Sequence, residues 1–296
     1  MAEPASVRVR CPAKVNLGLW ILGRRPDGYH EVDTILQAVS LEDELELAPG
    51  PPGLSLTTSG IKIPGPGPNL IERAWELLSE RAKPSSGIRA RLIKRIPIGA
   101  GLGGGSSDAA GFLAGANLLL GLKLMPEEIS DMAMRLGADV PFFLRGGTAR
   151  GTGRGDKMRH LCPTGPFWAV LVSPPVAIST TWAYGRVRKD LTQREGQASI
   201  LEFAIASRDW NAIVSAMYNV FEDVVLPEYP SLAELRRAIL ACGAKKVLLA
   251  GSGSTLFAMA KGHDEAMAIA GGVAGRGSEV RVVRALERGV TVAPLA

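Results

Sequence analysis

The sequence predicts an α+β protein with two domains. The chain has 296 residues, which is more than one hydrophobic core of ordinary size serves. Its strand-like and helix-like segments do not alternate strictly, and such an order favours mostly antiparallel sheets. The Gly-rich residues 146–155 indicate the boundary, so we expect one domain at residues 1–155 and a second at residues 156–296.

The first half of the chain opens on a strand. Apolar and polar side chains alternate over residues 7–22, which predicts a half-buried strand with Lys14 and Asn16 side by side on the face away from the core. Apolar residues at helical spacing follow Asn69, which is suited to cap that helix, and Pro126 with two glutamates starts another helix. Further strands are expected at residues 41–47, 54–57 and 88–96.

The second half mixes helices and strands. Helices are expected near residues 181–187, 199–206, 210–220 and 231–242 and from about residue 265. Strands are expected at residues 167–172, 247–250, 256–260 and, as the last element, 280–284. This order completes the α+β prediction.

The composition is that of a globular protein. Hydrophobic residues make up 46% of the chain and charged residues 21%. The net charge is +5, but the basic residues are scattered and the aromatic residues, at 5%, do not interleave with them. We therefore expect no nucleic-acid partner, and a mild attraction for anionic metabolites accounts for the charge.

Cysteines and apolar segments bear on location. Cys11, Cys162 and Cys242 lie far apart, which excludes a CxxC redox motif and suits a reducing cytosol. The first residues have neither a basic start nor an apolar run, so we expect no signal peptide. Because no stretch reaches the roughly 18 apolar residues of a membrane helix, we expect a cytoplasmic protein without a membrane partner.

Residues 97–108 carry the strongest chemical signal, the sequence Pro-Ile-Gly-Ala-Gly-Leu-Gly-Gly-Gly-Ser-Ser-Asp. Its clustered glycines leave several backbone N–H groups free to converge on one anion. Ser106, Ser107 and Asp108 then open a helix whose N-terminus adds roughly half a positive charge. A strand, a Gly-rich loop and a helix in this order predict a site for a phosphate or pyrophosphate.

Two common phosphate-binding motifs match this loop incompletely. Residues 99–104 fit the G-x-G-x-x-G dinucleotide fingerprint, but the preceding strand is half polar and no acid stands near position 120 to hold a ribose. A Walker A loop needs a lysine where Gly105 stands. A dinucleotide-dependent oxidoreductase stays open as an alternative from another class.

Residues 97–107 closely resemble the phosphate loop of the galactokinase, homoserine kinase, mevalonate kinase and phosphomevalonate kinase superfamily. Four further motifs occur in the order of one kinase family within it: Pro-Ala-Lys-Val-Asn-Leu (12–17), Arg-Pro-Asp-Gly-Tyr-His (25–30), Leu-Gly-Ala-Asp-Val-Pro (136–141) and Leu-Ala-Gly-Ser-Gly-Ser-Thr (249–255). Each motif alone is of moderate specificity, but five motifs in family order are highly specific.

The resemblance implies a fold and an activity. The expected fold is a ribosomal S5 domain 2-like N-terminal domain and a ferredoxin-like C-terminal domain, with the active site in the cleft between them. The expected activity is the transfer of a phosphoryl group from ATP to a hydroxyl of a small molecule that carries a cytidine diphosphate, in the non-mevalonate route to isoprenoid precursors. A related kinase that acts on another small alcohol is the nearest alternative. We expect a monomer or a weak homodimer.

The ATP site follows from the phosphate loop. The resemblance assigns to it Asn69, Pro97, Ile98, Gly99, Ala100, Gly101, Leu102, Gly103, Gly104, Gly105, Ser106 and Ser107. Capping of its own helix explains Asn69 equally well. Mg²⁺ is implied as the ion that accompanies ATP, held by the phosphates and by Ser106 or Ser107, with no acidic metal ligand assigned.

Lys14 and Asp139 form the catalytic pair by resemblance. Phosphoryl transfer needs a group that accepts the proton of the attacking hydroxyl, which a carboxylate does. An ammonium group beside that carboxylate keeps it ionised and stabilises developing negative charge. Lys14 and Asp139 supply these two groups.

The substrate-binding residues implied are Asn16, Tyr29, His30, Asp139, Thr180, Tyr184, Gly251 and Ser252. In the family, His30 hydrogen-bonds the cytosine while Tyr29 and Tyr184 cover its two faces. Gly251 and Ser252 border the diphosphate, in a turn that holds the phosphate loop. A place for Tyr184 in the core is the alternative.

Overall fold

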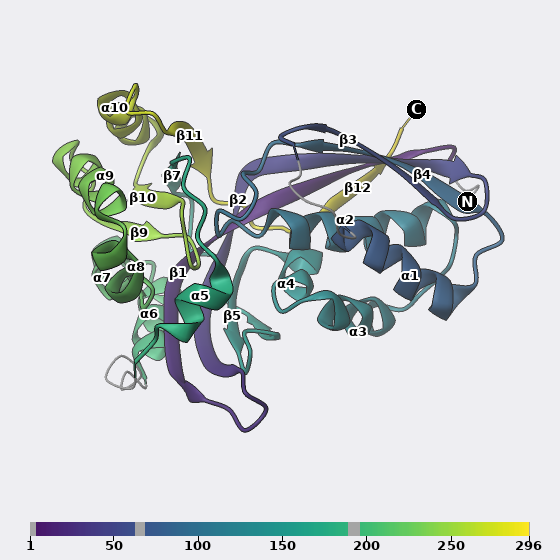
Figure 1. The fold of residues 1–296 in the computed structure, drawn as a ribbon, viewed down its shortest axis with the longest axis horizontal. Coiled ribbons are helices and arrows are strands. Elements are labelled where there is room, and N and C mark those ends of the chain that lie inside the picture. Colours follow the sequence, from purple (N-terminus) through teal and green to yellow (C-terminus); the bar gives the residue numbers. More distant parts are fainter. Residues whose placement is uncertain (1–3, 63–68, 189–195, 296) are drawn as a thin grey trace.

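Two sheets stand side by side in the computed structural model, which describes residues 4–62, 69–188 and 196–295 (Figure 1). Helices cover the outer face of each sheet, and two further helices, at residues 197–206 and 210–216, pack into the core between the sheets. This is the α+β class that the sequence predicts.

The first sheet is built around a long antiparallel hairpin of β1 and β2, and its main strand order is β12-β1-β2-β4-β3. Strand β5 pairs with β2 and β6, and β8 pairs with β1. The strands of this sheet are β1 (Val7–Arg24), β2 (His30–Gly50), β3 (Leu54–Gly60), β4 (Gly87–Lys94), β5 (Thr148–Thr152), β6 (Lys157–His160), β8 (Tyr218–Asn219) and β12 (Thr291–Pro294).

Four helices pack on the outer face of the first sheet and enclose the first core. Phe112, Phe142 and Phe143 are fully buried there against strand residues such as Val9 and Leu45. Burial of a side chain of this size contributes about 1.5–3 kcal/mol. The helices are α1 (Leu70–Ala82), α2 (Gly104–Leu119), α3 (Pro126–Leu136) and α4 (Val140–Arg145).

The second sheet has the order β11-β7-β10-β9 and all its pairs are antiparallel. One face packs on the first sheet through the second core, and the other carries helices through the third core. Its strands are β7 (Trp168–Ser173), β9 (Val247–Leu249), β10 (Leu256–Ala260) and β11 (Glu279–Arg284). The remaining helices are α5 (Thr180–Gly185), α6 (Gln197–Ala206), α7 (Trp210–Ala216), α8 (Glu222–Glu228), α9 (Pro230–Ala241) and α10 (His263–Val273).

A bulge in β1 decides which way its polar side chains point. The register with β2 shifts between Pro12 and Ala13, and a bulge exchanges the two faces of a strand. Val9 therefore faces the first core, whereas Val15 faces the second. The expectation that Lys14 lies on a face away from the core was wrong, because both faces are covered and Lys14 is 4% exposed.

The structure corrects several boundaries. Strand β11 is not the last element, because β12 follows it and pairs with β1 in the first sheet. The helix expected to reach residue 220 ends at Ala216, after which β8 joins β1. The Gly-rich residues 146–155 contain β5, and α4 and α8 were not foreseen. The division into residues 1–155 and 156–296 stays a prediction, with β6 and β12 lying in the first sheet.

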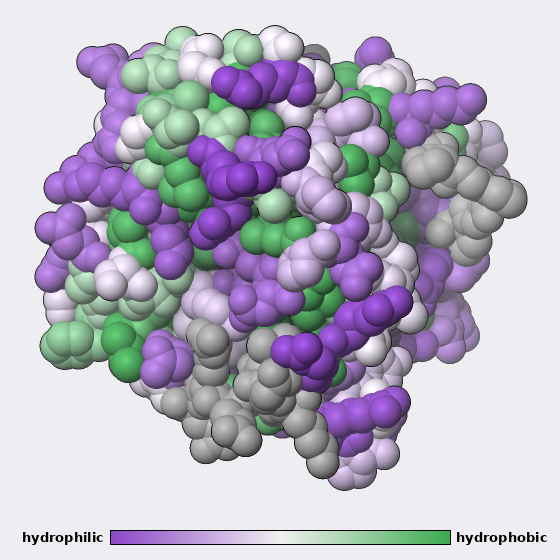
Figure 2. Space-filling model, turned by 60° about the vertical axis from the view of Figure 1, so that its left-hand side comes forward, coloured by the Kyte–Doolittle hydropathy of each residue, from purple (hydrophilic) through white to green (hydrophobic). Residues whose placement is uncertain are grey.

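The surface is predominantly hydrophilic on the face that Figure 2 presents, where hydrophobic residues form small scattered patches. Among the described residues, no helix has both the length and the apolar character to cross a membrane.

Candidate active site

The phosphate loop joins the end of β4 to the start of α2. Gly99, Gly101 and Gly103 have φ angles of +66°, +81° and +73°, which only glycine adopts without strain. Gly101 also lies so close to the carbonyl oxygen of Ala250 that a Cβ atom would stand 1.8 Å from it. The loop therefore needs its glycines both for its path and for its contact with the second half of the chain.

A cavity of about 330 Å³ opens along this loop. It is lined by Asn69, Leu70, Lys94, every residue from 97 to 106, and Asp108. All residues predicted to bind ATP line it except Ser107, which is fully buried beneath it. The backbone of the first turn of α2 faces the same cavity, so the cavity combines free N–H groups with the positive end of a helix.

Asn69 caps α1, which confirms one of its two predicted roles. Its side chain accepts a hydrogen bond from the backbone N–H of Ile71 at 3.1 Å, and its own N–H donates to Glu72 at 2.6 Å. This reciprocal capping box fixes Asn69 at the edge of the cavity. A contact with ATP stays a prediction.

A buried charged triad lies under the loop. Lys94 Nζ donates to Asp108 Oδ2 at 2.7 Å and, more closely still, to Asp43 Oδ2. Asp43 Oδ1 accepts the backbone N–H groups of Arg95 and Ile96, the latter at 2.9 Å. Because Asp43 belongs to β2, Lys94 to β4 and Asp108 to α2, the triad ties both ends of the loop to the first sheet.

Charges in the triad are interdependent. Burial raises the pKa of the Asp108 carboxyl to about 7, with the charge of Lys94 opposing that rise. Burial also disfavours the charged form of Lys94, but the two carboxylates outweigh it and raise the pKa of the ammonium. Lys94 therefore stays protonated, and its charge is held by Asp43 and Asp108.

The predicted catalytic pair is brought together at the other side of the loop. Lys14 Nζ lies 3.6 Å from Asp139 Oδ2 and donates to Asn16 Oδ1 at 2.8 Å. The Lys14 side chain is 5% exposed and that of Asp139 37%, so the carboxylate is open to solvent and the ammonium stands largely enclosed beside it. Asp139 stands before the first turn of α4 without capping it, which leaves its side chain free to face Lys14.

The Gly-rich motif at residues 249–255 contacts both the phosphate loop and Asn16, the hydrogen-bond partner of Lys14. Gly251 donates its backbone N–H to Asn16 Oδ1 at 3.0 Å, and Thr255 donates its N–H to the carbonyl of Ala100 at 3.3 Å. Ser252 shares a hydrogen bond of 3.1 Å with Thr180. Five predicted substrate residues thus belong to one connected network of polar contacts: Asn16, Asp139, Thr180, Gly251 and Ser252.

The rings of His30 and Tyr184 lie against each other at the predicted nucleoside end, with centroids 5.2 Å apart. Tyr184 also packs edge-on against Phe221. Burial first, and then the charge of Asp139, raise the pKa of Tyr184 to about 12, so its hydroxyl is neutral. Tyr184 therefore has a core contact and at the same time stands within electrostatic reach of Asp139.

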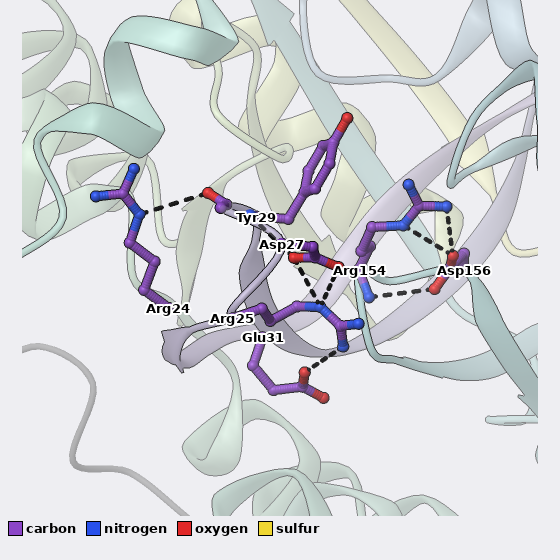
Figure 3. A network of polar contacts seen from close by, with 8 residues as sticks. Arg24, Arg25, Asp27, Tyr29, Glu31, Arg154 and Asp156 are labelled. Atoms are coloured by element: carbon purple, nitrogen blue, oxygen red, sulfur yellow. Dashed lines mark hydrogen bonds and ion pairs between the residues drawn. The ribbon is translucent and has the colours of Figure 1, made fainter.

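Tyr29 lies on the turn between β1 and β2, within a network of surface ion pairs (Figure 3). It is 58% exposed, and the guanidinium of Arg154 lies over its ring, 5.1 Å from the centroid. Asp27 accepts the N–H of Tyr29 at 3.1 Å and pairs with Arg25 at the same distance. The two rings predicted to cover the cytosine thus differ sharply in exposure.

The sequence analysis did not predict several residues that hold the candidate site in place. Thr34 accepts a hydrogen bond from Asn16 at 2.9 Å, and buried Asn219 donates to the carbonyl of Gly251 at 2.7 Å. Lys94 could have been found, because it continues the buried positions Ile88, Ala90 and Leu92 of β4. A lysine at such a position needs carboxylate partners.

Comparisons with known proteins agree with this geometry. The model of the GHMP kinases N terminal domain matches residues 69–147, and that of the GHMP kinases C terminal domain matches residues 201–278. A 4-diphosphocytidyl-2-C-methyl-D-erythritol kinase of Exiguobacterium sibiricum is 38% identical over 282 residues, 95% of this chain and 98% of the relative. The kinase of the same name from Symbiobacterium thermophilum is 42% identical over 253 residues, 85% and 89% of the two chains.

Solved structures share the fold. A crystal structure of 4-(cytidine 5'-diphospho)-2C-methyl-D-erythritol kinase has a TM-score of 0.81 and 34% identity, covering 94% of this chain and 98% of that one. A homoserine kinase from Cytophaga hutchinsonii, at a TM-score of 0.76 and 21% identity over 99% of both chains, shows the fold alone.

Fold and phosphate loop define a GHMP kinase, an ATP-dependent small-molecule kinase. Within that class, the chain belongs to the family of 4-diphosphocytidyl-2-C-methyl-D-erythritol kinases. The dinucleotide-dependent oxidoreductase considered from the G-x-G-x-x-G pattern is thereby ruled out.

Proposed function

We propose that this chain transfers the γ-phosphoryl group of ATP to the 2-hydroxyl of 4-diphosphocytidyl-2-C-methyl-D-erythritol. The observation that carries the proposal is the pair of Lys14 Nζ and Asp139 Oδ2, 3.6 Å apart and next to the phosphate loop. Relatives named for this activity, at 38% and 42% identity, support the choice of substrate.

Asp139 acts as the general base. As the acceptor oxygen forms its bond to the γ-phosphorus, its proton passes to the Asp139 carboxylate, and the bond from that phosphorus to the bridging oxygen breaks to release ADP. Lys14 keeps the carboxylate ionised and stabilises the charge that develops on the transferred group. Asn16 holds the Lys14 ammonium at 2.8 Å and thereby orients it.

The phosphate loop binds the ATP phosphates through its backbone N–H groups and the start of α2. Mg²⁺, when bound with ATP, neutralises phosphate charge. The donors present fit such an ion, because Ser106 and Asp108 line the cavity and the buried Asp108 Oδ1 has no hydrogen-bond partner among the described residues. Hydroxyl and carboxylate oxygens are the protein donors that Mg²⁺ prefers.

We place the cytidine at His30, Tyr184 and Tyr29. The rings of His30 and Tyr184 lie 5.2 Å apart, and Tyr29 precedes His30 in the chain. Tyr184 is already supported by Phe221, so it supplies a preformed face for the base. His30 has its pKa lowered by burial and by the charge of Arg24, so at neutral pH it is a neutral hydrogen-bonding group. Such recognition at a distance from the reacting hydroxyl holds that hydroxyl in place.

An assay of ADP release tests the proposal. The acceptors are 4-diphosphocytidyl-2-C-methyl-D-erythritol, methylerythritol phosphate, mevalonate and homoserine, with phosphorus NMR of the product to locate the new phosphate. We expect release with the first acceptor and a phosphate on its 2-hydroxyl. Faster turnover of mevalonate or homoserine would favour the related kinase on another alcohol. A cytoplasmic location and a monomeric or weakly dimeric state remain predictions from the sequence.

A further inference from the structure

A second cavity, of about 640 Å³, lies apart from the proposed active site. Its walls come from β5, from the chain after β6 and from the segment after β11. None of the residues proposed to bind ATP or the acceptor lines it. Gln37 in its floor pairs with Val15, whose side chain faces the second core, so the cavity opens on the opposite face of the first sheet from Lys14.

Unpaired positive charge distinguishes this cavity. Arg145, Arg284 and Arg288 line it, and within the described part of the chain none of the three guanidinium groups has an ion pair or a hydrogen bond. Glu287 is the one carboxylate among the lining residues, and it too forms no ion pair with them at 4.0 Å or less. Arg150 on β5, by contrast, pairs with Asp33 at 2.6 Å.

His160 adds a titratable donor to the same wall. Its Nδ1 lies 3.1 Å from the carbonyl oxygen of Gly146, and since a carbonyl only accepts, Nδ1 carries the hydrogen. Nε2 is then the ring nitrogen that can take up a proton and donate it to a ligand. Burial and the neighbouring charge of Arg145 lower the pKa of His160, and an anion in the cavity would act in the opposite direction.

The walls of the cavity are held in place by buried contacts. Gln37 is 1% exposed, and its amide nitrogen donates to the carbonyl groups of Ala38 and Leu286. Its amide oxygen accepts from the hydroxyls of Thr148 and Thr164, so both ends of the amide are hydrogen-bonded. Gly146, with a φ of +66°, passes so close to Gly289 that a Cβ atom would stand 2.2 Å from its nitrogen. The cavity is therefore preformed, and it does not depend on the positions of exposed side chains alone.

We propose that this cavity binds a diphosphate, either inorganic or carried by a small metabolite, at a site separate from the nucleotide cavity. Ligand pockets typically span about 300–1,000 Å³, and this one falls in that range. A guanidinium group donates two parallel hydrogen bonds to a phosphate, so three unpaired arginines match the charge and the acceptor number of a diphosphate. Protonated Nε2 of His160 supplies a further donor.

Calorimetry with pyrophosphate tests the site on the full chain. The protein is first saturated with a non-hydrolysable ATP analogue and cytidine diphosphate, so that the active site is filled. We expect one further equivalent of pyrophosphate to bind. Arg284→Gln combined with Arg288→Gln should weaken it by about 10-fold or more per arginine, because a hydrogen bond to a charged group contributes about 1.5–3 kcal/mol.

Arg276→Gln is the matched control, because Arg276 is exposed and lies outside the cavity. It removes the same charge and should leave pyrophosphate binding unchanged. Absence of binding to the saturated wild type, or an equal loss in both variants, would overturn the proposal. The comparison of variants stands even if the chain phosphorylates another acceptor, so it is independent of the proposed function.

NMR titration of the histidine rings gives a second readout that a structural role of the arginines would not move. The chain has 3 histidines, so the signals are few. Bound pyrophosphate should raise the pKa of His160. The charged groups that line the cavity with it are Arg145, Arg284, Glu287 and Arg288. The ring signals of His263 on α10 should not respond to pyrophosphate, because His263 lies outside the cavity. An unchanged pKa of His160 with pyrophosphate bound would contradict the proposal.

Discussion

The two ends of the proposed active site are built differently. Under the phosphate loop, Lys94 and Asp43 are 4% and 0% exposed and are tied to backbone and to each other. At the nucleoside end, Tyr29 is 58% exposed on a turn held by surface ion pairs, which contribute little to stability. The phosphate loop is therefore held by buried contacts, whereas the turn is held only at the surface. We therefore expect substitutions at the first end to damage folding and ATP binding together, and substitutions at the second end mainly to weaken binding of the acceptor.

Asp139→Asn should have the largest effect on catalysis. Asparagine keeps the shape but accepts no proton, and loss of a general base typically lowers kcat by about 10²–10⁴-fold. ATP affinity should be retained, since Asp139 is not part of the phosphate loop. Steady-state kinetics with calorimetry of ATP binding check both points, and Asp131→Asn on the exposed side of α3 is the control. A variant with near wild-type kcat would show that another group takes the proton.

Lys94→Met should lower the free energy of unfolding by about 3–5 kcal/mol, because it leaves two buried carboxylates without their cation. Adding Asp43→Asn and Asp108→Asn should restore part of the loss. Urea denaturation measures the free energy of unfolding of each variant, and Lys157→Met, at an exposed lysine, is the control. If Lys94→Met costs no more than Lys157→Met, the triad does not hold the loop.

Asp108 should make stability depend on pH. Its folded-state pKa of about 7 lies above its ordinary value of 3.8, so the folded state binds the proton more tightly. The stabilisation is complete below pH 4 and is lost as pH rises to about 7, by at most about 1.4 kcal/mol per pH unit. The free energy of unfolding of the wild type relative to Asp108→Asn should fall over that range. If the free energies of unfolding of wild type and Asp108→Asn change with pH in parallel, the pKa of Asp108 is not raised in the folded state.

Arg154→Gln should have the smallest effect. The contact of its guanidinium with the exposed ring of Tyr29 is worth about 0.5–1 kcal/mol, or a few-fold in binding. We expect the KM of the cytidine acceptor to rise a few-fold with kcat and the KM of ATP unchanged. Arg159→Gln, on β6 and outside the turn, controls for the lost charge. A large loss of kcat would show that the turn is a rigid part of the site.

The phosphate loop can be recognised from the sequence because its glycines and serines act through backbone and local geometry, which a short motif encodes. Its contacts with ATP stay a prediction. Lys14 and Asn16 were predicted as neighbours from the alternation along their strand, whereas only the family resemblance brought Asp139 to them. The burial of Lys14 and Asn16 was not foreseen, since the bulge at Pro12 leaves no pattern in the sequence.

Long-range pairing explains the other errors. Strand β12 joins β1 across nearly the whole chain, and no local periodicity indicates such a partner. The triad of Asp43, Lys94 and Asp108 is likewise assembled by the fold from three separate elements. The contact of His30 with Tyr184 needs the β1–β2 turn to meet α5.

A cycle of two enzymes and two acceptors tests whether Tyr184 binds the cytosine. Wild type and Tyr184→Ala are each assayed with the cytidine acceptor and with methylerythritol phosphate, and Tyr184→Phe controls for the hydroxyl. Stacking on a base is worth about 1–3 kcal/mol, so Tyr184→Ala should lower kcat/KM about 10- to 100-fold for the cytidine acceptor and scarcely for the other. Equal losses with both acceptors would mean that Tyr184 serves the core and that the nucleoside end has been misplaced.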